Sequence, residues 1–165
     1  ETSSKTPSWI EKNREGLDNW ELKLGLPPFS PPLSKNEAFK YLDNTSEDRQ
    51  KMTPEECADA VIALAHFSAY VTRASQREES EALMLKEQIT KLIGEEIPLM
   101  KAYSPEERKS LALAENEKAR ELESLRIASS VKSKRLYMYA DKIDKVAKAY
   151  ETLSYSRKRN RQYGE

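Results

Sequence analysis

Apolar side chains recur at alternating steps of three and four residues in two long stretches of the chain. In the first stretch the repeating positions are Cys57, Val61, Leu64, Ser68, Val71, Ser75, Glu78, Ala82, Leu85, Ile89 and Leu92. In the second they are Leu122, Leu125, Ser129, Lys132, Leu136, Tyr139, Ile143, Val146, Tyr150 and Leu153. This spacing places the side chains along one side of an α-helix, as in a coiled coil. The pattern predicts two long helices, each with a narrow apolar seam.

Start and stop signals delimit these helices. "TPEE" (53–56) and "SPEE" (104–107) each place a hydroxyl residue at the N-cap, proline at the first helical position and glutamate three residues after the cap. Gly94 and Pro98 lie between the two helices, and neither glycine nor proline occurs from 55 to 93 or from 106 to 163. We therefore predict helices over 54–93 and 105–160. Folded back on each other, they form an all-α, coiled-coil-like antiparallel hairpin.

For residues 1–52 we predict an N-terminal arm that is mostly irregular. Its "LPPFSPPLSK" segment (26–35) is expected to run extended, because paired prolines remove hydrogen-bond donors and restrict the residues before them. A short helix is expected before this segment and another over 36–42. Trp9 and Trp20 in so polar a region favour docking of the arm onto the chain's own helices or a neighbouring subunit. The chain thus divides into an arm, 1–52, and a two-helix hairpin, 53–165.

Polar interruptions of the seams and a surplus of apolar residues on the first helix bear on whether the hairpin self-associates. Each seam has a polar interruption, at 72–81 and 129–135, and the two fall roughly opposite each other in an antiparallel hairpin. A polar layer, a splayed region or an oligomer contact would each account for them. The first helix also begins with apolar residues on more than one side, over 61–67, and a lone hairpin leaves such a surplus exposed. We therefore predict a homo-oligomer.

Residue types common in enzyme active sites are scarce. The single His66 and the single Cys57 cannot supply a histidine-based triad or a Cys/His zinc site within one chain. We expect His66 to be a packed structural imidazole. The glycines are isolated, so a glycine-rich phosphate loop is not present. The sequence predicts a protein that is not an enzyme and that uses no cofactor or metal.

Cysteine usage and hydropathy bear on the compartment. One cysteine cannot form an internal disulfide, and no apolar run reaches the roughly 18 residues of a membrane span. A signal peptide is not recognised. We expect an intracellular protein, in the cytoplasm, or in the host cytoplasm if it is viral.

Charge is unevenly distributed along the chain, although 28 basic and 28 acidic residues cancel overall. Residues 132–165 contain ten Lys/Arg and four acids, a net charge of +6. Cations neutralise phosphates, and an exposed tyrosine ring can stack on an unpaired base. The candidate nucleic-acid-binding residues are Lys134, Lys142, Lys145, Lys148, Tyr155, Arg157, Lys158, Arg159 and Arg161.

The same basic end admits other partners. Lys and Arg near a helix C-terminus also complement the helix dipole, and an acidic protein or a second subunit would bind this surface as readily as a nucleic acid. A membrane surface is not expected, because a membrane-bound helix would show bulky apolar residues opposite its basic face with no partner helix to cover them.

The helix order resembles a known family. A tyrosine-containing helix, "AHFSAYVTRASQREESEALMLKEQITKLIG", is followed by a turn and a long helix that ends in "RLYMYADKIDKVAKAYETLSYSRKRN". This arrangement is similar to the phage recombination mediators of the UvsY type, which are small helical ring-forming proteins that bind single-stranded DNA and load a recombinase. The resemblance implies phosphate contacts at Lys142, Lys145, Lys148, Arg157, Lys158 and Arg159, and stacking at Tyr155. The alternative interpretation is a structural or adaptor subunit of a virion or other multi-protein assembly.

Overall fold

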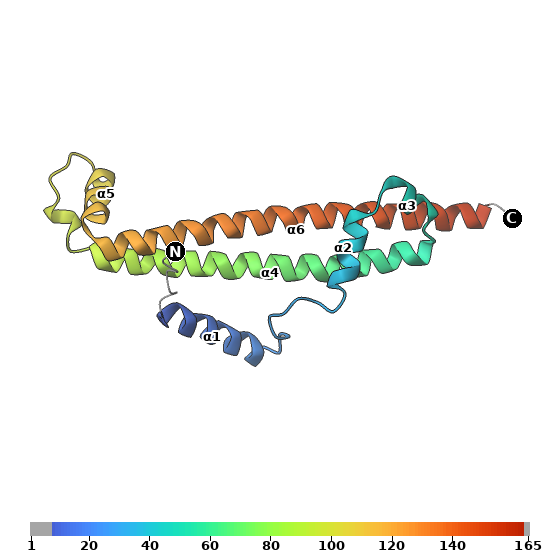
Figure 1. Ribbon diagram of the computed structural model, residues 1–165, viewed down its shortest axis with the longest axis horizontal. Coiled ribbons are helices and arrows are strands. Elements are labelled where there is room, and N and C mark those ends of the chain that lie inside the picture. Colours follow the sequence, from blue (N-terminus) through green and yellow to red (C-terminus); the bar gives the residue numbers. More distant parts are fainter. Residues whose placement is uncertain (1–7, 164–165) are drawn as a thin grey trace, which may run out of the picture. The chain divides into compact units, whose positions relative to one another are not determined.

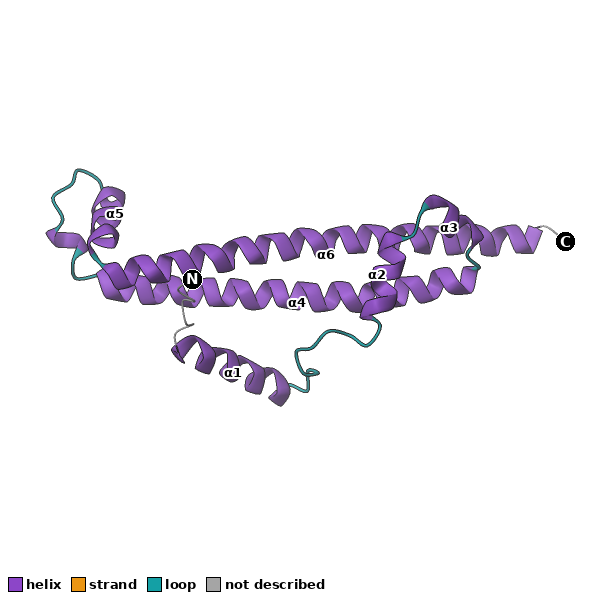
Figure 2. Cartoon of the chain, in the orientation of Figure 1, coloured by secondary structure: helices purple, strands orange, loops and turns teal. Residues whose placement is uncertain are grey.

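The computed structural model describes residues 8–163, with side chains as far as residue 160. The helices are α1 (Ser8–Lys23), α2 (Lys35–Asp43), α3 (Ser46–Lys51), α4 (Pro54–Ile93), α5 (Pro105–Glu115) and α6 (Glu117–Tyr163), with a short 3₁₀ helix, η1 (Ile97–Leu99), after α4. Figure 1 labels the α-helices, and Figure 2 shows helices joined by loops, with no strand in the described part of the chain. The chain forms two compact units, residues 1–70 with 146–165 and residues 71–145.

The predicted all-α hairpin fold is confirmed. α4 and α6 pack against each other. In the first unit the Ser154 hydroxyl donates to the Pro54 carbonyl oxygen at 3.1 Å, and in the second the Ser75 hydroxyl donates to the Ser133 carbonyl oxygen at 2.9 Å. Pro54, at the start of α4, contacts a residue late in α6, whereas Ser75, further along α4, contacts an earlier residue of α6. The two helices therefore run antiparallel. The seam positions of α4 are all buried or half-buried.

The ends of α4 lie where the sequence places them, although the glycine acts differently from expectation. At the start, the Glu56 carboxylate accepts from the Thr53 main-chain N–H at 2.7 Å, and the Thr53 hydroxyl accepts from the Glu56 N–H at 3.1 Å, which completes the capping box. At the end, Gly94 has no positive φ. A Cβ at this position would lie 2.9 Å from the Thr90 carbonyl oxygen. The glycine is therefore required by a close approach of the backbone.

The prediction of one continuous helix over 105–160 is wrong. The main chain leaves the helical conformation at Asn116, which has φ −97° and ψ 103°, so that α5 ends and α6 begins there. The Asn116 side chain accepts a hydrogen bond from the Ala119 N–H at 3.0 Å and donates to the Glu96 carboxylate at 3.3 Å. Asparagine is among the strongest N-cap residues, so it can start a new helix without glycine or proline. The break lets α5 pack against η1.

The N-terminal arm contains helices separated by the proline-rich segment. The two predicted short helices are present as α1 and α2, and α3 was not predicted. α1 ends in a Schellman motif, in which Gly25 has φ 78° and the Leu26 N–H donates to the Glu21 carbonyl oxygen at 3.1 Å. Residues 26–32 contain neither helix nor strand. Within this unit Phe29 stacks on Tyr70 with ring centroids 5.2 Å apart, so the segment is held by an aromatic contact.

The polar interruptions of the two seams meet within the second unit. Ser75 contacts Ser133, and the Ser129 hydroxyl donates to the buried Glu81 carboxylate at 3.4 Å. Lys132 forms an ion pair with Glu78 at 3.8 Å. Of the three explanations that the sequence left open, a polar layer between the helices accounts for these contacts.

Over residues 8–163, no helix combines the length and the apolar character needed to cross a bilayer.

Candidate nucleic-acid interface

The C-terminal part of α6 buries one side against the first unit. Tyr150 is fully buried, and its hydroxyl donates to the Tyr41 carbonyl oxygen at 2.8 Å. Its ring meets the Tyr41 ring edge-on with centroids 5.9 Å apart. Ser154 is buried against Pro54. These contacts fix the rotation of α6 about its axis and thereby decide which later side chains face solvent.

The exposed side of this segment carries an aromatic ring flanked by cations. Tyr155 is 66% exposed. Lys158 and Arg159 are exposed and lie three and four residues further along the helix, which makes them its neighbours on the helix surface. Among the described residues, neither cation has an acidic partner within ion-pair distance. We call Lys148, Tyr155, Lys158 and Arg159 the terminal cluster.

Lys148 belongs to this cluster but has an acidic neighbour. Its ammonium group donates to the Glu151 carboxylate at 2.8 Å. This hydrogen bond raises the pKa of Lys148, and the nearby Tyr155 raises it slightly further. Because the pair lies at the surface, with the Lys148 side chain 76% exposed, it is held only weakly, and a phosphate can compete with Glu151 for the ammonium group.

Arg157 does not face outward with the terminal cluster. Its guanidinium group donates to the carbonyl oxygens of Arg49 and Gln50, at 2.7 Å each. These two carbonyls lie at the C-terminal end of α3, which ends at Lys51, where free carbonyl oxygens favour a cation. The structure thus assigns Arg157 an internal contact that joins α6 to α3.

The remaining sequence-predicted cations lie elsewhere. Lys134, Lys142 and Lys145 belong to the second unit and are exposed. Lys145 pairs with Asp141 at 2.6 Å, and within the described residues no carboxylate pairs with Lys134 or Lys142. The side chain of Arg161 lies outside the described residues. The structure therefore brings together Lys148, Tyr155, Lys158 and Arg159 out of the nine predicted residues.

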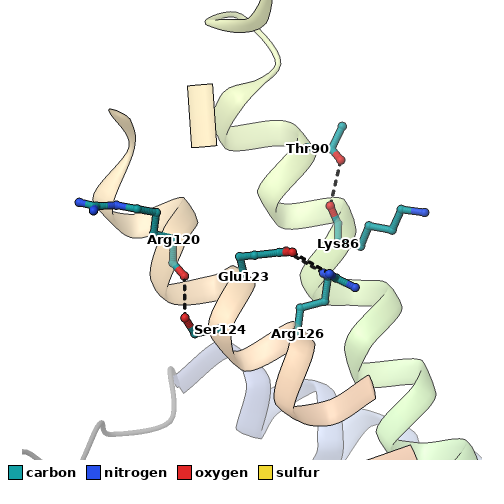
Figure 3. Close-up of polar contacts among 6 residues, drawn as sticks. All are labelled: Lys86, Thr90, Arg120, Glu123, Ser124 and Arg126. Carbon is teal, nitrogen blue, oxygen red and sulfur yellow. Dashed lines mark hydrogen bonds and ion pairs between the residues drawn. The ribbon is translucent and has the colours of Figure 1, made fainter. Parts of the chain in front are cut away.

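A second group of cations surrounds a hollow between α4, α5 and α6 in the second unit. Lys86, Lys109 and Arg126 line it together with Glu123. Figure 3 shows Arg126 reaching Glu123, with two hydrogen bonds of 2.6 and 2.7 Å. This contact lowers the pKa of Glu123 and raises the pKa of Arg126. One of the three cations is thus paired, as Lys148 is in the terminal cluster, but no aromatic ring among the described residues lines this hollow to take the part of Tyr155.

Of the two residues considered for catalysis, His66 and Cys57, the histidine differs from expectation in its exposure. His66 is exposed, so the prediction of a packed structural imidazole is wrong. Cys57 is fully buried, and burial raises the pKa of its thiol, which makes it a poor nucleophile at neutral pH. Among residues 8–160, no three His, Cys, Asp or Glu side chains gather as metal ligands would.

One contact that positions the candidate site, that of Arg157 with α3, was not predicted from the sequence. The signal for α3 is present, because Thr45 and Asp48 form a capping box in which each side chain accepts from the other's main-chain N–H. Its last carbonyls then need a partner. Arg157 is this partner, but it lies 108 residues further along the chain, and local sequence patterns do not reveal so distant a contact.

Comparison of the chain with protein-family models, with curated proteins and with solved structures finds no match.

Proposed function

We propose that this protein is a non-enzymatic, self-associating accessory protein that binds single-stranded nucleic acid through the terminal cluster. The observation that carries the proposal is the exposed ring of Tyr155, with Lys158 and Arg159 beside it on the helix surface. The similarity to recombination mediators of the UvsY type points to the same class of ligand. In that setting the protein would act beside a recombinase or a replication enzyme.

The chemistry of the cluster suits an unpaired strand better than a duplex. A base in a single strand can leave its neighbours and stack on an aromatic ring, which is worth about 1–3 kcal/mol per base. Cations three and four residues away can then hold the phosphates that flank this base. A duplex offers phosphates but no free base face, so it would use the cations and leave Tyr155 without a partner.

Internal contacts of α6 support the binding side. Tyr150, Ser154 and Arg157 all bond to main-chain carbonyl oxygens of the first unit. They hold the helix in one rotation and spare the cluster the entropy of ordering its backbone on binding. The proposal therefore gives Arg157 a positioning role, while Lys158 and Arg159 contact phosphate.

A second candidate function is that of an adaptor or structural subunit. It is favoured by large apolar side chains that lie exposed on the helices, among them Ile62, Leu83 and Met138 at 56, 57 and 62% exposure. Such residues commonly mark protein contacts. In this case the basic end would meet an acidic protein surface.

Fluorescence anisotropy with a labelled single-stranded oligonucleotide tests the proposed function. Tyr155→Ala is expected to weaken binding by about 5- to 150-fold, which corresponds to the loss of one stacked base. Tyr155→Phe keeps the ring and is the matched control, with affinity close to the parent. Absence of binding by the parent, or equal binding by Tyr155→Ala, would refute the proposal and favour the adaptor.

A further inference from the structure

The connection between α4 and α6 exposes an apolar surface. Tyr103 is fully exposed, Leu99 is 76% exposed, and Leu111 on α5 is 41% exposed. Tyr103 and Leu111 line a shallow hollow together with Lys101, Ala102 and Glu106. Large apolar side chains that are exposed close together are typical of contact surfaces. We call Leu99, Tyr103, Glu106 and Leu111 the turn surface.

This surface carries two carboxylates, unpaired within the described residues, beside its apolar residues. Residues 94–111, which span the surface, contain four glutamates and three Lys/Arg, a net charge of −1. Glu107 is occupied by the capping box of α5, and Glu96 accepts from Asn116. Glu95 and Glu106 are exposed, and no cation among the described residues pairs with either. A partner that covers the apolar residues would therefore gain by placing positive charge opposite Glu95 and Glu106.

A surface with that chemistry lies on α6 of the same unit. Ile127, Val131, Lys134, Met138 and Lys142 follow one another at steps of three and four residues, and all five are exposed. We call them the outer stripe. The opposite side of α6 is the buried one, with Ser129, Ala140 and Ile143. Residues 127–142, which span the stripe, contain four Lys/Arg and one acid, Asp141, so the stripe is apolar and basic together.

We infer that the turn surface of one copy docks on the outer stripe of a second copy. Leu99, Tyr103 and Leu111 would cover Ile127, Val131 and Met138, while Glu95 and Glu106 face Lys134 and Lys142. The inference rests on the self-association that the proposed function includes, and it names the surfaces involved. It assigns Lys134 and Lys142 to a protein contact and leaves the terminal cluster free for nucleic acid.

Charge decides between the possible arrangements of two copies. Two outer stripes repel each other because both are basic, and two turn surfaces have nearly balanced charge and gain little from facing each other. The unlike pairing sets the slightly acidic surface against the basic one and is therefore favoured. Each copy then uses two different surfaces, so the contact is head-to-tail and continues from copy to copy, either closing into a ring or extending as an open chain.

Charge-reversal variants mixed with each other test the inference. In Glu95→Lys/Glu106→Lys the turn surface becomes basic, and in Lys134→Glu/Lys142→Glu the outer stripe becomes acidic. Each variant alone pairs like charges, so self-association in analytical ultracentrifugation should weaken by about tenfold or more toward the 19.0 kDa monomer. Mixed in equal amounts, the two variants present opposite charges at every contact and should assemble as the parent does.

A matched control and a second measurement keep the outcomes distinct. Glu79→Lys/Glu87→Lys makes the same charge change at exposed positions of α4, away from both surfaces, and should assemble normally. Circular dichroism checks that every variant is folded. A parent that is monomeric, single variants that assemble, or a mixture that stays dissociated would each overturn the inference.

Binding of a short single strand, measured on the same variants, is expected to persist when assembly is lost. The inference and the proposed function can therefore fail separately. Restored assembly in the mixture without any strand binding by the parent would support the docking and refute the nucleic-acid role. Strand binding without restored assembly would support the nucleic-acid role and refute the docking.

Discussion

The guanidinium group of Arg157 donates a hydrogen bond of 2.7 Å to the main-chain carbonyl oxygen of Arg49, 108 residues earlier in the chain. A second bond of the same length reaches the carbonyl oxygen of Gln50. Arg49 in turn lies over the Tyr150 ring, 5.9 Å from its centroid. The end of α6 is thus tied to α3 through a main-chain contact and an aromatic contact. Arg157, one of the four Lys/Arg residues between positions 157 and 161, is therefore a structural part of the fold.

Arg157→Ala is expected to destabilise the protein. It removes two charge-assisted hydrogen bonds to the carbonyl oxygens of Arg49 and Gln50, of which the first retains, among the described residues, only the Met52 N–H, at a cost of about 1–3 kcal/mol. Urea denaturation measures the change in the free energy of unfolding. Arg159→Ala removes the same side chain from an exposed site and should leave stability within about 0.5 kcal/mol of the parent. Equal stability of the two variants would show that the contact with α3 contributes nothing.

Asn116→Ala is expected to destabilise the start of α6. The asparagine carboxamide accepts from the Ala119 N–H and donates to Glu96, so alanine leaves an N-cap donor and a carboxylate without their partner. Loss of an N-cap costs about 0.5–2 kcal/mol. Asn116→Ser keeps a cap acceptor and should lie between alanine and the parent in urea denaturation. If the serine variant were no more stable than the alanine variant, the capping role of Asn116 would be wrong.

The contribution of the Glu123–Arg126 pair should depend on pH. The hydrogen bond from Arg126 lowers the pKa of Glu123 in the folded protein. A lowered folded pKa means that the stabilisation is present above the unfolded pKa of a glutamate and is lost as the pH falls through the folded pKa. The parent should exceed Glu123→Gln in stability by a few tenths of a kcal/mol at neutral pH. A difference in unfolding free energy that does not shrink on acidification would contradict this assignment.

The fold follows from the sequence wherever local signals act on their own. The capping boxes at Thr53 and Ser104, and the glycine after Ile93, give the helix ends that the structure has. Asn116 was missed because the prediction relied on the absence of glycine and proline, and an asparagine can end one helix and start another. The exposure of His66 was missed because apolar neighbours in sequence need not share its side of a helix.

The candidate site was predictable in composition and less so in geometry. Arg157, Lys158 and Arg159 were all predicted to contact phosphate because they are adjacent cations. Consecutive residues on a helix point in different directions, however. Which of them faces inward is decided by Tyr150 and Ser154, through contacts with Tyr41 and Pro54 that are distant in sequence. Local periodicity alone does not carry that information.

The dependence of single-strand binding on salt concentration tests the central claim most directly. Lys158→Ala/Arg159→Ala removes the two cations beside Tyr155, and each lost phosphate contact lowers the slope of log affinity against log salt by about 0.7. The account predicts a slope about 1.4 smaller than that of the parent, with folding and self-association unchanged. Lys86→Ala/Lys109→Ala removes the same charge from the other cationic hollow and should keep the parent's slope. An unchanged slope in Lys158→Ala/Arg159→Ala would show that the terminal cluster holds no phosphate and would contradict the account.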